Sequence, residues 1–159
     1  HLSIRRQRQM CIRDSYKGIY KPSYPKKYKG DQRNIIYRSL WERKFMNYCD
    51  LNENILEWAS EEFFIPYHDP TTNRVRRYFP DFFIKYKDKD GNIRRSVIEV
   101  KPMRETLETN ATKGKSRKTM INESMTYVKN QANWRAAREF CDVRILEFKI
   151  MTEKELGIR

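Results

Sequence analysis

The sequence predicts one α/β domain in which helices flank a central mixed sheet. The chain has 159 residues, which is the length of one ordinary domain and enough to bury a core. Apolar residues recur at near-helical spacing in two separate stretches, and short strand-like segments lie between them. The expected order is therefore one helix, a run of strands, a second helix and a last strand.

Two segments precede the predicted domain, which we place at residues 31–159. Residues 1–15 contain neither an apolar core nor a small-residue cleavage site, so they do not indicate a secretory signal. Their sequence resembles translated sequencing-adaptor DNA, and we expect a non-native tail there. Residues 16–30 contain Pro22 and Pro25, which prevent a helix, so an extended basic arm is expected.

The first helix is expected to begin at Asp31 or Asn34, which are favourable N-cap residues, and to end at Cys49. A loop at 68–73 and an Asp-Gly turn at 88–92 separate the strand-like segments that follow. The expected strands are 56–58, 62–67, 75–86 with an interruption at Phe79-Pro80-Asp81, and 93–100.

The last third of the chain predicts a mobile loop followed by a helix and a strand. Residues 105–118 are polar and basic and carry no core-facing stripe. Helical spacing then runs through 120–140, strand-like residues follow at 143–150, and a short helix is expected at 152–156.

Composition favours a soluble protein that binds a polyanion. The formal net charge is +13, and 38% of the residues are hydrophobic without a run near the ~20 that a membrane-spanning helix requires. Nucleic acid is the default partner, although basic surfaces also occur on other proteins. Three widely spaced cysteines suggest neither a disulfide framework nor a zinc site, and fit a reducing cytoplasm.

One strand carries residues suited to phosphodiester cleavage, which needs carboxylates, a bound cation and an activated water. In the segment 97–101, the two-residue period of a strand places Glu99 and Lys101 on one face. Asp81 lies on the other arm of the expected hairpin, so its carboxylate can reach the same edge. Together these three residues predict a hydrolytic metal site.

Glu-x-Lys alone is weak evidence, because this charged chain contains it twice more, at 42–44 and at 147–149. The segment around Glu99 differs in its context. It is an apolar strand joined through an Asp-Gly turn to a strand that carries Pro80-Asp81, whereas Glu147 has no such partner. We therefore assign the chemistry to Glu99.

The pair Pro80-Asp81 with Glu99-Val100-Lys101 resembles the PD-(D/E)xK nuclease superfamily, and the resemblance spans about 31–150. It implies a restriction-endonuclease-like αβββαβ core and a metal-dependent endonuclease. By this resemblance Asp81, Glu99 and the carbonyl of Val100 hold Mg²⁺, for which Mn²⁺ can substitute. Lys101 then positions or deprotonates the attacking water.

Two further site residues follow from resemblance. The segment 38–44 is similar to the first helix of the endonuclease subunit of heteromeric transposases, which implies that Glu42 joins the site as a ligand. The alternative is an exposed partner of Arg38. Gln131 matches a glutamine that related nucleases carry near the metal, but Tyr127 and Trp134 do not reproduce the usual spacing.

Basic residues near the expected site are candidates for phosphate contacts, and solvated surface charge is the alternative. They form two groups, one before the Asp81 strand and one in the basic loop. The residues are Arg74, Arg76 and Arg77, and Lys113, Lys115, Arg117 and Lys118.

The stretch 16–156 also resembles the head completion nucleases of T-even-like tailed phages, through motifs such as Phe79-Pro80-Asp81-Phe82. That resemblance implies a virion component, also present in the host cytoplasm, that acts on double-stranded DNA or DNA ends beside portal and head proteins. The alternatives are a neck protein that binds DNA ends without cutting, and a transposase-type or Holliday-junction-type nuclease. The oligomeric state stays open.

Overall fold

The computed structural model describes residues 17–108 and 114–158 of the chain, which divides into two compact units. The first unit combines the described part of His1–Ser60 with Asp81–Arg95. The second combines Glu61–Pro80 with the described part of Ser96–Arg159. The chain therefore leaves the first unit, returns to it and leaves again.

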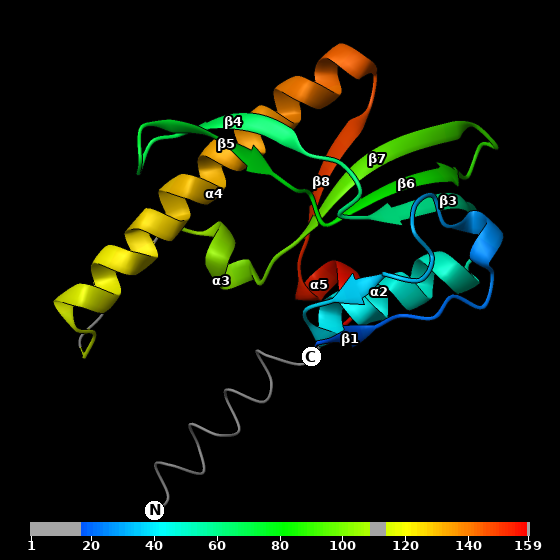
Figure 1. The fold of residues 1–159 in the computed structure, drawn as a ribbon, viewed down its shortest axis with the longest axis horizontal. Helices are drawn as coiled ribbons and strands as arrows, with labels where there is room; N and C mark the ends of the chain where they lie inside the picture. The colour runs from blue at the N-terminus through cyan, green and yellow to red at the C-terminus, as the bar shows by residue number, and fades with distance from the viewer. Residues whose placement is uncertain (1–16, 109–113, 159) are drawn as a thin grey trace, which may run out of the picture. The chain divides into compact units, whose positions relative to one another are not determined.

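Four strands form one mixed sheet, in the order β3-β6-β7-β8 (labels as in Figure 1). β3 pairs with β6 antiparallel, and β7 pairs with β8 parallel. Helix α2 packs against β3 in the first unit, and α4 packs against β8 in the second. This arrangement confirms the predicted mixed α/β architecture. The strand bounds are Ile55–Ser60, Phe82–Lys87, Ile93–Val100 and Glu147–Met151.

The first helix begins later than the sequence predicts. Helix α2 spans Leu40–Leu51, because Ser39 has extended backbone and accepts a hydrogen bond from the Glu42 amide at 3.1 Å as the N-cap. Upstream, β2 (Ile36–Tyr37) pairs instead with β1 (Gly18–Ile19). The apolar Ile35 and Tyr37 are buried, but they are not helical.

The basic arm contributes to the core of the first unit. After β1 it forms a single 3-10 turn, η1 (Pro25–Lys27), and then Tyr28 forms a parallel bridge with Trp58. The Tyr28 ring is 3% exposed and meets the fully buried Trp58 edge-on, with the centroids 4.7 Å apart. The arm is therefore packed rather than only laid over the surface.

In the second unit a two-stranded hairpin packs against one long helix. The hairpin consists of β4 (Ile65–Asp69) and β5 (Arg74–Tyr78), and it lies alongside α4 (Arg117–Arg144) (Figure 1). The shared core contains residues from all three elements: Ile65, Tyr67, Tyr78, Trp134 and Ala137.

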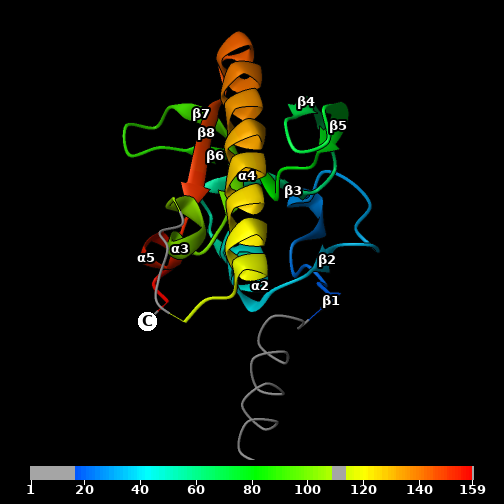
Figure 2. The ribbon, with the colours of Figure 1, turned by 90° about the vertical axis from the view of Figure 1, so that its left-hand side faces the viewer.

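Two short helices complete the second unit. α3 (Met103–Thr106) follows β7, and α5 (Glu153–Leu156) follows β8. Figure 2 shows them close together, and the Met103 amide donates to the Glu153 carboxylate at 2.8 Å. The predicted C-terminal helix is confirmed, with Thr152 as its N-cap in a capping box with Glu155.

Predictions around α4 were wrong at both ends. Ser116 caps the helix, so Arg117 and Lys118 belong to its first turn and not to a loop. At the other end the helix continues through Arg144 because Ile145 provides a left-handed C-cap, so the strand expected at 143–150 begins only at Glu147. Residues 105 and 106, also expected in the loop, are helical in α3.

No helix in the described ranges is long and apolar enough to cross a membrane. Cys49 and Cys141 are free and buried. Burial raises the pKa of both thiols, that of Cys141 to about 11.

Candidate active site

Glu99 is a buried carboxylate on an apolar strand. It is 4% exposed and lies between Ile98 and Val100 near the end of β7. The Lys101 ammonium lies 3.2 Å from Glu99 Oε1, with 29% of its side chain exposed. The carboxylate and the ammonium therefore meet as the strand period predicts, with the cation nearer to solvent.

Tyr78, which the sequence did not single out, holds the other oxygen of this carboxylate. Its hydroxyl donates to Glu99 Oε2 at 2.6 Å, and its side chain is buried. An ionised carboxylate needs such partners when it leaves water. Glu99 is therefore fixed from two sides, by Lys101 and by Tyr78.

The register of β7 and β8 separates this site from the similar Glu147-x-Lys149 pair. Ser96 and Ile98 pair with Glu147 and Lys149, whereas Glu99 pairs with Ile150. Paired residues of parallel strands share a face, so Glu147 and Lys149 lie on the opposite face from Glu99. They form their own ion pair at 2.8 Å.

Asp81 lies immediately before β6, where it is half-buried, and the preceding Pro80 is fully buried. It belongs to the first unit, whereas Glu99, Val100 and Lys101 belong to the second. Their approach to one another therefore stays a prediction. Val100 is the last residue of β7 and pairs with Met151.

Glu42 serves as the reciprocal partner of a helix cap. Its Oε2 accepts from the Arg38 backbone amide at 2.7 Å, and its Oε1 accepts from Ser39 Oγ at 3.0 Å. With the Ser39 cap this is a capping box, which the sequence Ser39-x-x-Glu42 could have indicated. Glu42 therefore contacts the backbone of Arg38 as part of the helix cap, and its role as a metal ligand stays a prediction.

Gln131 is half-buried on α4. It lines a groove of about 610 Å³ together with Tyr67, His68 and Arg135. Glu99 and Lys101 are not among the described residues that line this groove. That Gln131 lies near the predicted metal site therefore stays a prediction.

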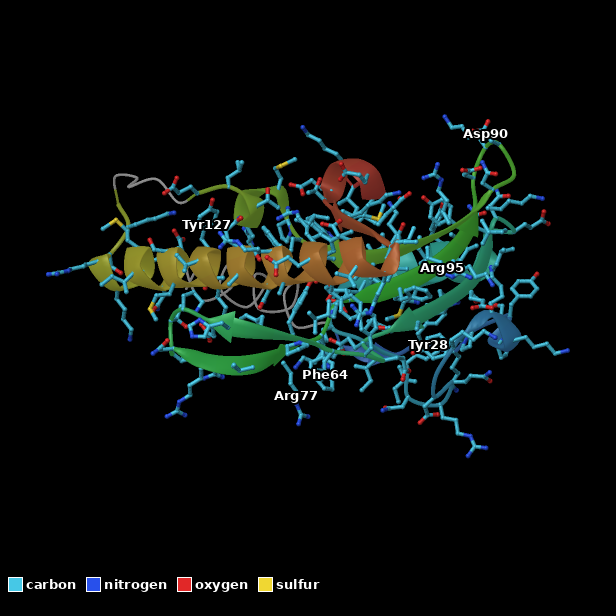
Figure 3. All side chains as sticks on the ribbon, turned by 90° about the horizontal axis from the view of Figure 1, so that it is seen from above. Tyr28, Phe64, Arg77, Asp90, Arg95 and Tyr127 are labelled. Atoms are coloured by element: carbon cyan, nitrogen blue, oxygen red, sulfur yellow. The ribbon has the colours of Figure 1, made fainter. Side chains whose placement is uncertain are left out.

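The basic residues of β5 are exposed. Arg76 Nε lies 3.2 Å from the buried Asp69, whose pKa is held below its usual value by hydrogen bonds from Thr71 and other groups. Arg77 lies over the Phe64 ring, 5.0 Å from its centroid, and Figure 3 shows both side chains on the hairpin. Arg74 is also exposed. All three arginines can reach a polyanion from this hairpin.

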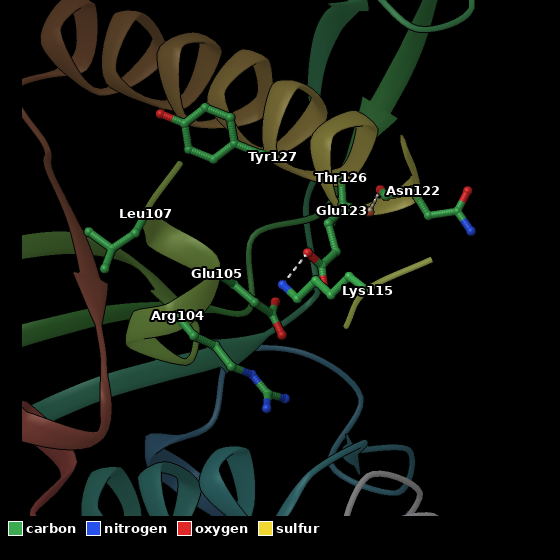
Figure 4. A pocket seen from close by; sticks show the side chains of 8 residues that line it. All are labelled: Arg104, Glu105, Leu107, Lys115, Asn122, Glu123, Thr126 and Tyr127. Carbon is green, nitrogen blue, oxygen red and sulfur yellow. Dashed lines mark hydrogen bonds and ion pairs between the residues drawn. The ribbon is translucent and has the colours of Figure 1, made fainter. Parts of the chain in front are cut away.

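A second basic region lies where α3 faces the beginning of α4. There a groove of about 620 Å³ is lined by Arg104 and Lys115, and Lys115 pairs with Glu123 at 2.7 Å (Figure 4). Arg117 and Lys118 are exposed in the first turn of the helix. Lys113, the remaining predicted phosphate contact, lies outside the described residues.

The donor atoms of the predicted set fit a hard divalent cation. Asp81 and Glu99 offer carboxylate oxygens and Val100 a carbonyl oxygen, which are the ligand types of Mg²⁺. The described residues contain no cluster of three or more acidic, histidine or cysteine side chains that could hold a metal. Mg²⁺ keeps several waters and binds through one or two carboxylates, so the small number of acidic groups is compatible with it.

Comparisons with known proteins show which family the chain resembles. Residues 52–153 match the family model described as TnsA-like endonuclease N terminal. The chain is also 34% identical over 145 residues to the head completion nuclease of Enterobacteria phage T4, across 89% of this chain and 94% of that protein. Asp81, Glu99 and Lys101 lie within the matched range.

Proposed function

This chain belongs to the TnsA-like endonuclease family and is a nuclease, and from this premise we propose that it is a metal-dependent DNA endonuclease acting on the ends of packaged phage DNA. The observation that supports the proposal best is the buried Glu99 carboxylate, held between the Lys101 ammonium and the Tyr78 hydroxyl. A surface that only binds DNA gains nothing from a buried acidic group of this kind.

Asp81, Glu99 and the Val100 carbonyl would hold the metal in this proposal. When bound, Mg²⁺ would neutralise charge on the scissile phosphate and lower the pKa of a water, and Mn²⁺ has the same ligand preferences. Glu42 would join only if its carboxylate left the cap of α2.

Lys101 would orient the attacking water as the ammonium, which is the cation nearest to Glu99 among the described contacts, or take up the proton of the water as the neutral amine. Its partial exposure allows solvent and DNA to reach it. Tyr78 would act as a positioning residue, because its hydroxyl fixes the Glu99 carboxylate without needing to touch the substrate.

The exposed arginines on β5 and the basic groups at the beginning of α4 would bind the phosphate backbone, and the net charge of +13 would draw DNA toward them. The similarity to a phage head completion nuclease supports a place in the virion and in the host cytoplasm, beside portal and head proteins. Double-stranded DNA or its ends is the substrate in this role.

A transposase-type nuclease is the second candidate, because the family model describes TnsA-like endonucleases. The two candidates share their chemistry and differ in the DNA that they cut. A preference for free duplex ends favours the phage role, whereas cutting at fixed positions within specific sequences favours the transposase role.

The test is incubation of the full chain with linear and circular duplex DNA, with Mg²⁺ or with EDTA. We expect cutting in Mg²⁺, none in EDTA, and recovery when Mg²⁺ or Mn²⁺ is added in excess. Gel electrophoresis measures the products. Equal cutting in EDTA would exclude metal dependence, and DNA binding without any cutting would favour a structural DNA-end protein.

Replacing Tyr78 with phenylalanine should lower the cleavage rate about ten-fold and raise the Mg²⁺ concentration for half-maximal rate, because Glu99 loses a hydrogen bond in a buried place. Tyr67→Phe is the matched control, since this buried tyrosine lies in the same core. An equal loss in both variants, without a change in Mg²⁺ dependence, would mean that Tyr78 serves only packing.

A further inference from the structure

The open end of the β4–β5 hairpin carries two exposed phenylalanines. Ile65 pairs with Tyr78, and Phe64 and Phe79 lie one residue beyond this pair on either strand. Their ring centroids are 5.8 Å apart, and the side chains are 46% and 45% exposed. They therefore form a joint apolar surface at the end of the hairpin.

Strand alternation explains why these rings do not join the core. Ile65, Tyr67 and Tyr78 turn toward α4 and are buried, so Phe64 and Arg77 belong to the other face. The Arg77 guanidinium lies over the Phe64 ring, 5.0 Å from its centroid. Figure 3 shows Phe64 and Arg77 at this end of the hairpin. We call Phe64, Phe79 and Arg77 the aromatic step.

We propose that the aromatic step binds unpaired bases of the DNA substrate, so that the protein prefers duplexes with single-stranded overhangs over blunt duplexes. Bases in a duplex are stacked on one another, whereas an unpaired base offers a π-face to an aromatic ring or a guanidinium. The inference rests on the proposed nuclease function and specifies which form of DNA the nuclease binds.

The charge around the step favours a nucleic acid as its occupant. Arg74, Arg76 and Arg77 are all exposed on β5; Arg77 shares the face of Phe64 and Phe79, whereas Arg74 and Arg76 lie on the other face, where Arg76 Nε is 3.2 Å from Asp69. Val75, between them, is 74% exposed. Exposed aromatic rings with an arginine on the same face, on a hairpin that carries two more arginines, match an unpaired strand, which has π-faces and phosphates together.

The experiment uses the full chain in EDTA, so that binding is measured without cutting. The probes are a duplex with an overhang that carries 2-aminopurine and the corresponding blunt duplex. We expect tighter binding of the overhang and quenching of 2-aminopurine as it stacks. The double variant Phe64→Ala/Phe79→Ala should lose the quenching and about ten-fold in overhang affinity, with blunt-duplex affinity unchanged within two-fold.

Three further variants make the test specific. Arg77→Lys keeps the charge and loses the planar group, so it should lower the affinity for the overhang more than the affinity for the blunt duplex. Tyr24→Ala removes an exposed aromatic ring elsewhere, 56% exposed, and should change neither affinity. Phe64→Leu keeps the apolar volume and removes the π-face, so it should also lose the quenching. It provides the test if the double variant does not fold.

Equal affinity of the unaltered chain for both duplexes would overturn the inference and point to a protein partner for the step. Unchanged quenching in the double variant, or in Phe64→Leu, would also overturn it, as would equal losses on both duplexes. Failure of the nuclease proposal looks different, because the chain would then cut nothing in Mg²⁺ while its overhang preference in EDTA could persist.

Discussion

Replacing Lys101 with methionine is expected to lower the cleavage rate by about 10³-fold and to leave DNA affinity nearly unchanged. Methionine keeps much of the side-chain volume, so the change removes chiefly the ammonium that lies 3.2 Å from Glu99 Oε1. Without the Lys101 ammonium, the site loses the cation beside Glu99 that would orient the water and stabilise the developing negative charge. Single-turnover cleavage in Mg²⁺ measures the rate, and a salt titration of binding in EDTA measures affinity.

The chain provides a matched control in Lys149→Met. Lys149 has the same Glu-x-Lys spacing, lies on the neighbouring strand and pairs with Glu147 at 2.8 Å, but on the opposite face of the sheet. Its replacement should change the cleavage rate less than two-fold. Equal losses in the two variants would show that only net charge matters, and a normal rate in Lys101→Met would remove Lys101 from the catalytic set.

Strand β7 shows what could be predicted from local pattern. Its bounds, Ile93–Val100, agree with the prediction because the preceding turn has its own chemistry: Gly91 has a φ of 82°, which glycine adopts without strain. Once the strand begins, the two-residue period fixes the common face of Glu99 and Lys101. Both halves of that pair could therefore be found without any knowledge of packing.

The beginning of α2 could not be placed correctly because two local signals competed. Apolar residues from Ile36 onward have helical spacing, but Ile36 and Tyr37 pair with β1 as strand β2 in the first unit. The Ser39-x-x-Glu42 capping box marks the true start, and spacing alone does not reveal that it prevails. Helix caps thus carried more information here than periodicity.

Tyr78 was missed for a different reason. Its contact with Glu99 joins residues 21 positions apart and depends on how the hairpin packs in the second unit. No local period encodes such a contact. The same holds for the division into two units, since residues 61–80 join the C-terminal part of the chain instead of their neighbours in sequence.

Replacing Asp50 with alanine is expected to lower the free energy of unfolding by about 3 kcal/mol, the largest stability effect that we expect from a polar residue of the first unit. Asp50 is 1% exposed and accepts from the Ser23 amide at 2.7 Å, the Tyr24 amide at 2.9 Å and the Tyr20 hydroxyl at 3.0 Å. Alanine would leave these three donors without their acceptor, and the arm would lose three of its hydrogen bonds to α2.

Lys27 joins the arm to the same end of the helix independently. Its ammonium donates to the carbonyls of Cys49, Asp50 and Asn52, each within 2.8 Å, and so satisfies groups that the helix end leaves without a partner. Lys27→Met should therefore also destabilise the arm, but less than Asp50→Ala, because Lys27 is only half-buried and water can reach its carbonyl partners in its place.

Amide hydrogen exchange and urea unfolding together test this assignment. In Asp50→Ala the exchange of the Ser23 and Tyr24 amides should accelerate strongly, and the unfolding midpoint should fall by about 1–2 M urea. Glu53→Ala, an exposed carboxylate just beyond the same helix, should change neither. If Ser23 and Tyr24 remain protected in Asp50→Ala, then the packing of Tyr28 on Trp58 holds the arm alone, and the hydrogen bonds to Asp50 contribute little to its stability.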